Sequence, residues 1–439
     1  MKRTIIFLCI LIPVLTLAQE KAWTLEECVQ YAVEHNQQRT RQEAQIKILN
    51  QNQLEAIGGF LPSLNARTSA NFRFGRSLDS KNNQYVSTDN FGNDYEIYSS
   101  MTLFDGLSQV YRLKMARVNK VRGVNKLQEV KDMLAFETME IFYNVLYYKG
   151  TVELAEQQLE ESTANLKLVQ RMEELGLKAA PDVTEIQAKE AEDRYALTKQ
   201  MNLLDLEIIK LREKMNYPIE QEFAIADEGD HLIVNHTKEN AFEIYQQALN
   251  FLPKALVSER TVLASEMEYK VYKGRLFPSI SVGGSVSTNF SRLMDGSDYD
   301  SFKDQIKNRR GEYVGFTLSI PIFNRFSNSA EIKRSKQRLV IARSEHEETL
   351  RQIYSEIEQA VADVNGLSDE YYYSKKKTEA MSSAHQVNKR KYEEGLINAI
   401  ELTTSSNRLL NSRVEELYTS LKYQLRRKWV EYYKGNPVY

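Results

Sequence analysis

The chain has 439 residues, of which 42% are hydrophobic and 27% are charged, and its formal net charge is −2. This balance provides no positive field for nucleic acid, so we expect no nucleic-acid partner. No stretch reaches 18 apolar residues, which excludes a bundle of transmembrane helices. The 18 glycines and 8 prolines are few for this length, and their scarcity predicts long uninterrupted helices.

The first 18 residues have the pattern of a secretory signal peptide. Lys2 and Arg3 precede an apolar run over 5–17, and Ala18 is a small residue suited to a cleavage site. A membrane anchor or a buried helix is the alternative, but the apolar run is short for a span and polar sequence follows it. We therefore expect residues 1–18 to be removed and the mature chain to be exported.

The mature sequence contains two similar repeats. Similar residues recur in the same order at a spacing of 219, which indicates an internal duplication. The first repeat covers 19–218 and the second 219–439, and each is expected to run helix, strand, loop, strand, very long helix, turn and helix. The matched positions are Phe104 and Phe323, Gly176 and Gly395, Asp182 and Glu401, and Pro218 and Pro437.

In the first repeat, apolar and polar residues alternate and predict strands at about 63–74 and 95–104. The stretch at about 107–175 has no proline and two glycines, which predicts a single helix roughly 100 Å long. A partner helix is expected at about 182–215. A helix of such length cannot fold back into a globule, so it must run beside other helices.

The second repeat follows the same plan, with strands at about 279–290 and 313–323. A long helix is expected at about 327–394 and a partner helix at about 400–434. Apolar residues along the long helix are spaced alternately by three and four, which predicts a coiled-coil seam. The seam residues are Leu350, Ile353, Ile357, Ala360, Val364, Leu367 and Tyr371.

Each predicted strand has one apolar and one polar face, and about ten such residues can cross a bilayer when tilted. We expect the even-numbered residues near Phe72, Val286 and Phe316 to face lipid. Four strands cannot close a barrel and an open edge cannot face lipid, so several chains must pool their strands. Three chains give a 12-stranded outer-membrane β-barrel on an α-helical barrel, a mainly α fold with a small β part. An ordinary sheet on a soluble core is the alternative.

These features together resemble the TolC-type outer-membrane efflux proteins, over essentially the whole mature chain. The resemblance implies a homotrimeric exit duct in outer-membrane lipid, with its helical barrel in the periplasm. It also implies a periplasmic adaptor (membrane fusion) protein and an inner-membrane transporter as partners, in tripartite efflux or type I secretion of small molecules or proteins. The residues that carry it are Trp23 to Cys28, Pro62 and Pro278, Leu103 to Gly106, Gly176 and Leu177, Asp182 and Val183, and Tyr392 to Leu396.

Each long helix must turn into its partner, and Gly176 and Gly395 suit such turns because glycine tolerates positive φ at a helix C-terminus. The resemblance implies that the adaptor docks at these turns, on Gly176, Leu177, Gly395 and Leu396. The alternative is that these residues only end one helix and begin the next.

The resemblance also implies a periplasmic gate, in which Asp182 bonds Tyr392 and holds the closed state. Three copies of Glu401 would then ring the constriction with negative charge and favour cations. Ile397 stands where the family has a second gate-bonding arginine, and Thr404 stands where a second acidic ring would lie. A helix cap for Asp182 and a solvated face for Glu401 are the alternatives.

The sequence lacks the residue patterns that are typical of metal sites and enzyme active sites. The five histidines show no metal-ligand spacing, and there is neither a paired-cysteine motif nor a phosphate-binding glycine loop. The mature chain keeps one cysteine, Cys28, and so has no internal disulfide. We expect no metal, no cofactor and no enzymatic activity. The competing function is a soluble periplasmic coiled-coil scaffold whose strands form a small capping sheet.

Overall fold

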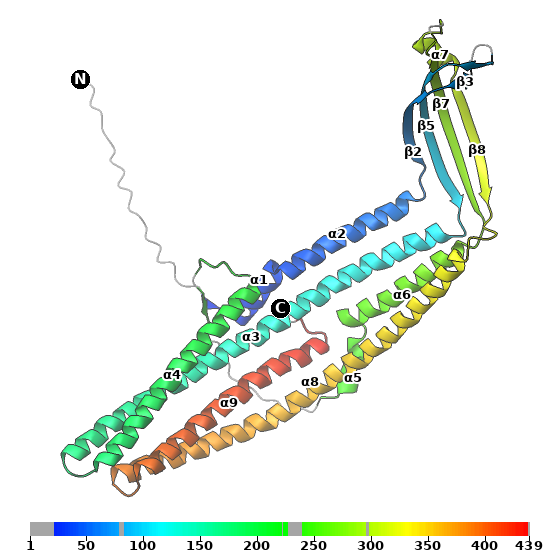
Figure 1. The fold of residues 1–439 in the computed structure, drawn as a ribbon. Helices are drawn as coiled ribbons and strands as arrows, with labels where there is room; N and C mark the ends of the chain where they lie inside the picture. The colour runs from blue at the N-terminus through cyan, green and yellow to red at the C-terminus, as the bar shows by residue number, and fades with distance from the viewer. Residues whose placement is uncertain (1–21, 79–82, 222, 227–238, 296–297, 438–439) are drawn as a thin grey trace, which may run out of the picture. The chain divides into compact units, whose positions relative to one another are not determined.

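The computed structural model describes residues 22–78, 83–221, 223–226, 239–295 and 298–437, so the expected signal peptide lies outside the described residues. Long helices dominate and a small antiparallel sheet accompanies them (Figure 1), which confirms the predicted fold class. The chain forms two compact units that do not follow the repeats. The first unit comprises Met1–Thr40, Val130–Ala248 and Tyr354–Tyr439, and the second comprises Arg41–Glu129 and Leu249–Ile353.

The second unit contains a four-stranded antiparallel sheet in the order β2-β5-β7-β8. Its strands are β2 (Ser63–Arg73), β5 (Asn90–Phe104), β7 (Ser279–Leu293) and β8 (Gly311–Ser319). β5 begins five residues earlier than expected, because its first residues pair with both β2 and β7. β8 ends four residues earlier than expected, since β7 offers no partner beyond Ser279 and Pro321 cannot donate a ladder hydrogen bond.

The strand register gathers the apolar residues on one face of the sheet. Ile97 pairs with both Ala66 and Val286, and Phe316 pairs with Val282, so alternate residues of all four strands share this face. Phe316 is 74% exposed in the single chain. The opposite face carries polar contacts such as the Ser69 hydroxyl donating to an Asp94 carboxylate oxygen at 3.0 Å. The sheet therefore has the two-faced character that the alternation predicted.

Two small elements lie in the connections between paired strands. β3 (Arg76–Leu78) and β4 (Tyr85–Ser87) form a short hairpin between β2 and β5. Helix α7 (Phe302–Asn308) lies between β7 and β8 and packs its Phe302 ring against Phe290, with ring centres 5.3 Å apart. Neither element was predicted from the sequence, which indicated only a loop between the two strands of each repeat.

Helices lead into and out of the sheet. α2 (Gln37–Gly58) and α6 (Pro253–Gly274) precede the first strand of each strand pair, and the 67-residue helices α3 (Ser108–Glu174) and α8 (Ser327–Glu393) follow the second. The ends of α3 and α8 lie within one residue of the expected positions. Each of these two helices contributes residues to both compact units, which is why the units do not follow the repeats.

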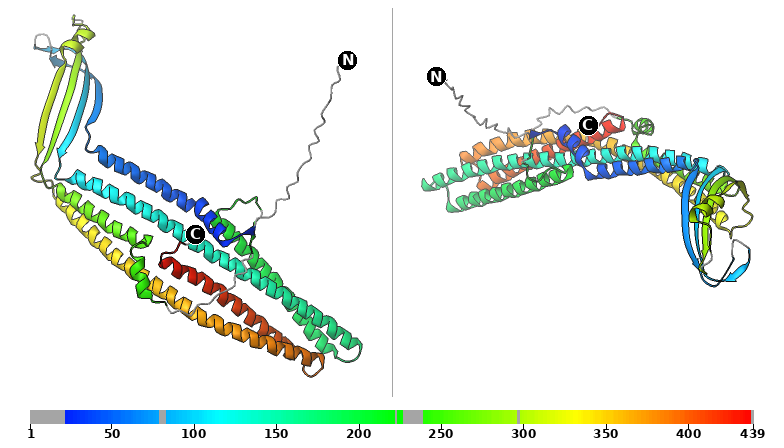
Figure 2. Two further views of the ribbon diagram at one scale, coloured as in Figure 1. Left: turned by 180° about the vertical axis from the view of Figure 1, so that it is seen from behind. Right: turned by 90° about the horizontal axis from the view of Figure 1, so that it is seen from above.

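The first unit holds two helical hairpins. Figure 2 shows α4 returning along α3 and α9 returning along α8. Two very short strands pair in parallel beside them. The remaining elements of this unit are β1 (Ala22–Trp23), α1 (Leu25–His35), α4 (Ala180–Met215), β6 (Ala224–Ile225), α5 (Ala241–Ala248) and α9 (Ala399–Tyr433).

The main core of this unit joins helices from both repeats. Phe142 and Met139 of α3 are buried with Leu211 of α4, and Cys28 of α1 belongs to the same cluster. Trp429 of α9 packs against this cluster from the second repeat. Fully burying an apolar side chain contributes roughly 1.5–3 kcal/mol, so this cluster fixes the hairpins to each other at the α1 end.

The predicted seam of α8 packs as expected over most of its length. Its five central positions, from Ile353 to Leu367, are buried, and the two outermost ones, Leu350 and Tyr371, are half-buried. Among the residues that the structure describes, no helix combines the length and apolar character required to cross a membrane.

Candidate functional site

Each hairpin of the first unit turns at a glycine. Residues 175–179, the first tip, connect α3 to α4, and residues 394–398, the second tip, connect α8 to α9. Gly176 has φ of +71° and Gly395 has φ of +73°. Both lie in the left-handed region, which glycine adopts without the steric cost that a side chain brings. The expected use of these two glycines is therefore seen in the structure.

The two tips have the same hydrogen bonds. The Leu177 amide donates to the Met172 carbonyl at 2.8 Å, and the Leu396 amide donates to the Lys391 carbonyl at 2.8 Å. This is the Schellman pattern, in which the residue after the glycine often packs back on its helix. Here Leu177 is 69% exposed and Leu396 is 67% exposed. Each tip thus presents a large apolar side chain to its surroundings.

A small apolar cluster, the tip core, lies directly behind the tips. Tyr392 of α8 is 1% exposed within it. Ile397 is half-buried against the same cluster, so the position that holds an arginine in the family serves packing here. The buried members of the tip core are Val169 of α3, Ile186 of α4, Tyr392 of α8, and Ala399 and Leu402 of α9.

The Tyr392 hydroxyl is buried and has no hydrogen-bond partner in the structure. Burial raises the pKa of Tyr392, and the nearby charge of Asp182 raises it further. The Lys178 ammonium lies 4.6 Å from the centre of the Tyr392 ring. Asp182 and Tyr392 are therefore neighbours, as the gate hypothesis requires, but the bond between them is not formed in the single chain.

The helix starts behind the tips show which residues cap α4 and α9. Ala179 is the N-cap of α4 and makes no side-chain cap bond, so Asp182 lies in the first turn and does not cap the helix. In α9 the Asn398 side chain is the cap and accepts a hydrogen bond from the Glu401 amide at 2.9 Å. Glu401 is exposed in the first turn. Neither acidic side chain caps its helix, and the exposed position of Glu401 agrees with the solvated face that is the alternative to the gate.

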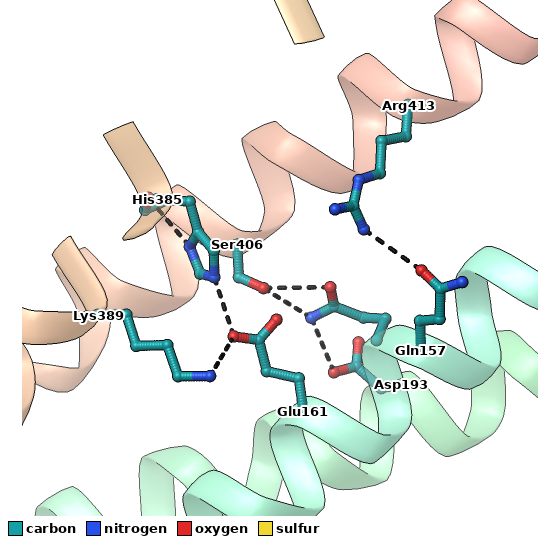
Figure 3. A network of polar contacts seen from close by, with 9 residues as sticks. Gln157, Glu161, Asp193, His385, Lys389, Ser406 and Arg413 are labelled. Carbon is teal, nitrogen blue, oxygen red and sulfur yellow. Dashed lines mark hydrogen bonds and ion pairs between the residues drawn. The ribbon is translucent and has the colours of Figure 1, made fainter. Parts of the chain in front are cut away.

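A network of polar contacts joins the two hairpins (Figure 3). His385 of α8 places its Nε2 2.9 Å from Glu161 Oε1 of α3. Lys389 Nζ lies 3.3 Å from the same oxygen, and the His385 Nδ1 lies 3.3 Å from the Ser405 hydroxyl of α9. The hydrogen bond from His385 is the largest cause of a lowered pKa at Glu161.

A second part of the network is centred on Gln158 of α3. Its amide nitrogen donates to the Ser406 hydroxyl at 2.9 Å and to an Asp193 carboxylate oxygen at 3.3 Å. Lys189 donates to Asp193 at 2.7 Å and to Asn407 at 2.6 Å. Lys189 and Asp193 are both less than 10% exposed, so this buried ion pair is compensated by its hydrogen bonds.

Sequence reasoning missed this network, although a signal for it exists. Continuing the seam of α8 from Tyr371 with the same spacing gives Ser374, Thr378, Met381 and His385. His385 is 5% exposed, as a seam position should be. A histidine in a coiled-coil seam requires a polar partner, which the sequence alone does not identify.

The other described histidines lie elsewhere. His35 approaches the Tyr31 carbonyl, and the His346 Nδ1 lies 2.8 Å from the Ser258 hydroxyl in the second unit. His231 and His236 lie outside the described residues. In the described part of the chain, no group of three metal-ligating side chains comes together.

Known proteins share both the fold and part of the sequence. Residues 244–431, most of the second repeat, match the family described as outer membrane efflux protein. A crystal structure of CusC aligns with a TM-score of 0.81 at 16% identity and covers 96% of each chain. VceC from Vibrio cholerae aligns at 0.79 and 12% identity over 94% of this chain and 97% of its own. CmeC from Campylobacter jejuni aligns with a TM-score of 0.80 at 10% identity and covers 94% of this chain and 87% of its own.

No curated protein sequence matches the chain. The chain shares the fold of these outer-membrane proteins over nearly its whole length, and the family match covers most of its second repeat. The predicted resemblance to the outer-membrane efflux proteins is confirmed. The second repeat is thus similar in sequence to the outer-membrane efflux proteins and the whole chain has the fold of known outer-membrane channels, so the soluble scaffold is not favoured.

Proposed function

We propose that three copies of this chain form one duct, which a periplasmic adaptor protein joins to an inner-membrane transporter. β2 and β8 are the outer strands of the sheet, and the sheet exposes an apolar face. In lipid every backbone polar group needs a partner, so an unpaired outer strand is unstable there. Pairing β8 of one copy with β2 of the next closes a ring of 12 strands from three copies.

The paired tips carry the docking part of the proposal. Leu177 and Leu396 occupy the same position in two identical turns, and both are more than 65% exposed. Two equivalent apolar side chains on rigid turns suit a partner that contacts both repeats in the same way. An adaptor with helical hairpins offers such repeated contacts, because an apolar stripe on a helix can receive each leucine in turn.

We expect Leu177→Ser combined with Leu396→Ser to weaken adaptor binding at least tenfold. Each leucine would lose roughly 1.5–3 kcal/mol of burial at the interface. The measurement is photocrosslinking in cells from a reactive residue placed at Lys178, followed by identification of the partner by mass spectrometry. The crosslink to the adaptor should disappear, while the amount of protein in the outer membrane stays at the parent level.

A matched control is Ile219→Ser, because Ile219 is 92% exposed in the first unit but lies away from both tips in the sequence. This variant should retain the crosslink. Adaptor binding by the double leucine variant at the parent level would show that the tips are turns and nothing more.

The gate part of the proposal concerns the residues around the tip core. We infer that Asp182 accepts a hydrogen bond from Tyr392 in the closed, assembled duct. A buried hydroxyl without a partner costs about 1–3 kcal/mol, so assembly gains stability if Asp182 satisfies it. The exposed Glu401, in the first turn of α9, would contribute one charge per copy to a negative ring that favours cations.

A further inference from the structure

Helix α7 lies at the end of the sheet where no long helix enters (Figure 1), since it connects the end of β7 to the start of β8. In the proposed duct the long helices lie in the periplasm, so this end is extracellular. We propose that α7 is a membrane-interface helix, whose Phe302 and Ile306 enter the outer leaflet while Lys303 and Lys307 contact the phosphates of its lipid headgroups. The proposal rests on the duct function proposed above.

The sheet holds α7 firmly at an open edge. β8 reaches only as far as Ser287 of β7, so within the described part of the chain residues 288–293 have no β8 partner. Helix α7 covers this edge. The Gln305 side-chain oxygen accepts a hydrogen bond from the Ser291 amide at 3.1 Å, and Arg309 donates to the Ser291 hydroxyl at 2.8 Å. Gln305 is 1% exposed, so α7 is a built part of the sheet end.

Aromatic rings form a continuous row across the apolar face of the sheet at this end. The ring centres of Phe72 and Phe91 are 4.8 Å apart, and those of Phe91 and Phe290 are 6.3 Å apart. Phe302 of α7 joins the row at 5.3 Å from Phe290, and its ring is 52% exposed. Aromatic girdles mark both water interfaces of membrane barrels, so this row indicates the level of the extracellular interface.

The length of the apolar face agrees with this level. Ile280 pairs with Phe104 at the other end of the sheet, and Phe290 lies ten residues after Ile280 on β7. At about 3.3 Å per residue and a tilt of about 40°, ten residues span about 25 Å across the bilayer. This is the height of the apolar band of outer-membrane barrels, so Phe104 and Phe290 mark its two edges.

The remaining surface of α7 combines apolar and basic side chains. Residues four apart share one face of a helix, so Phe302 and Ile306 form one flank and Lys303 and Lys307 form the adjoining flank. Both lysines are exposed, and neither makes a hydrogen bond or ion pair among the residues that the structure describes. Lysines beside an apolar flank at a membrane surface keep their charges in the headgroup layer, where lipid phosphates are the complementary groups.

Tryptophan fluorescence of the protein in lipid nanodiscs tests the position of α7. Phe302→Trp keeps an aromatic ring, and the parent's own tryptophans give a background that is subtracted. Asp304→Trp is the matched control, because Asp304 is exposed on the opposite flank of α7. Lipids brominated in the upper acyl chain should quench Phe302→Trp about threefold more strongly than Asp304→Trp, and iodide in the water should give the reverse order. Equal quenching of both tryptophans by iodide would overturn the proposal.

The role of the lysines is tested with lipids of different charge. Brominated phosphatidylglycerol should quench Phe302→Trp about threefold more strongly than the same amount of brominated phosphatidylcholine, because the lysines enrich anionic lipid. Lys303→Gln combined with Lys307→Gln should abolish this preference. The control removes the same charge from exposed positions of α8, through Lys333→Gln and Lys336→Gln, and should keep it. A preference that survives the loss of Lys303 and Lys307 would overturn the contact with phosphate.

The mass of the particle separates this proposal from the duct function. Native mass spectrometry of the parent and of each variant accompanies the fluorescence. A parent that forms no trimer would contradict the duct function, while the quenching still decides whether α7 enters lipid. A trimer in which Phe302→Trp and Asp304→Trp are equally open to iodide would overturn the assignment of α7 alone.

Discussion

Phe316→Arg should prevent the duct from assembling in the outer membrane. Phe316 is 74% exposed in the single chain and lies on the apolar face that the register defines. An arginine facing lipid at the middle of the bilayer costs about 2–4 kcal/mol, and three symmetry copies raise this to about 6–12 kcal/mol per trimer. The readout is the yield of trimer extracted by detergent from outer-membrane fractions, which should fall to near zero.

The neighbouring residue provides the control. Thr317 lies on the opposite, polar face of β8, and Thr317→Arg should leave the yield of trimer close to that of the parent. Val286 is a less suitable site, because Glu312 lies directly opposite it and could pair with the new arginine. Parent-level amounts of Phe316→Arg trimer would mean that this face of the sheet does not contact lipid.

Tyr392→Ala should give the largest increase in conductance of any single change near the tips. Its ring is 1% exposed and contacts tip-core residues of the other hairpin as well as its own. Removing a buried aromatic ring costs about 3–5 kcal/mol, and the loss falls on the closed arrangement of the two hairpins. Planar-bilayer conductance at matched salt measures the effect.

Smaller changes separate the ring from the hydroxyl. Tyr392→Phe keeps the packing and removes the proposed bond to Asp182, so it should raise conductance less than Tyr392→Ala does. Asp182→Ala should match Tyr392→Phe, and the double variant should add little, because the same bond is lost. Parent-like conductance of Tyr392→Phe would assign the closing effect to the ring alone, in agreement with the unpartnered hydroxyl of the single chain.

The long helices could be predicted closely because their ends are set by local chemistry. Gly176 and Gly395 end α3 and α8 through the same backbone turn, and such a turn is readable from the sequence. Strand ends are set by partners that lie far away in the sequence. β8 stops where β7 begins at Ser279, and β5 extends to Asn90 because two neighbours continue beside it.

The site was only partly accessible to sequence reasoning. The tips follow from two glycines, but the bridge from Glu161 to His385 joins residues 224 positions apart on helices of different repeats. Which side chains meet across two packed hairpins depends on the rotation of each helix about its axis, and the seam fixes this rotation only for α8. The role of Ile397 in the tip core likewise required the packing partners to be known.

The mass of the intact particle tests the central claim most directly. Protein extracted from outer membranes in mild detergent should give, by native mass spectrometry, a particle with three times the mass of one mature chain. Three copies of a four-stranded sheet then supply the 12 strands that a closed barrel needs. A folded monomer that is released by osmotic shock, with β2 and β8 protected from hydrogen exchange without any partner chain, would contradict the account.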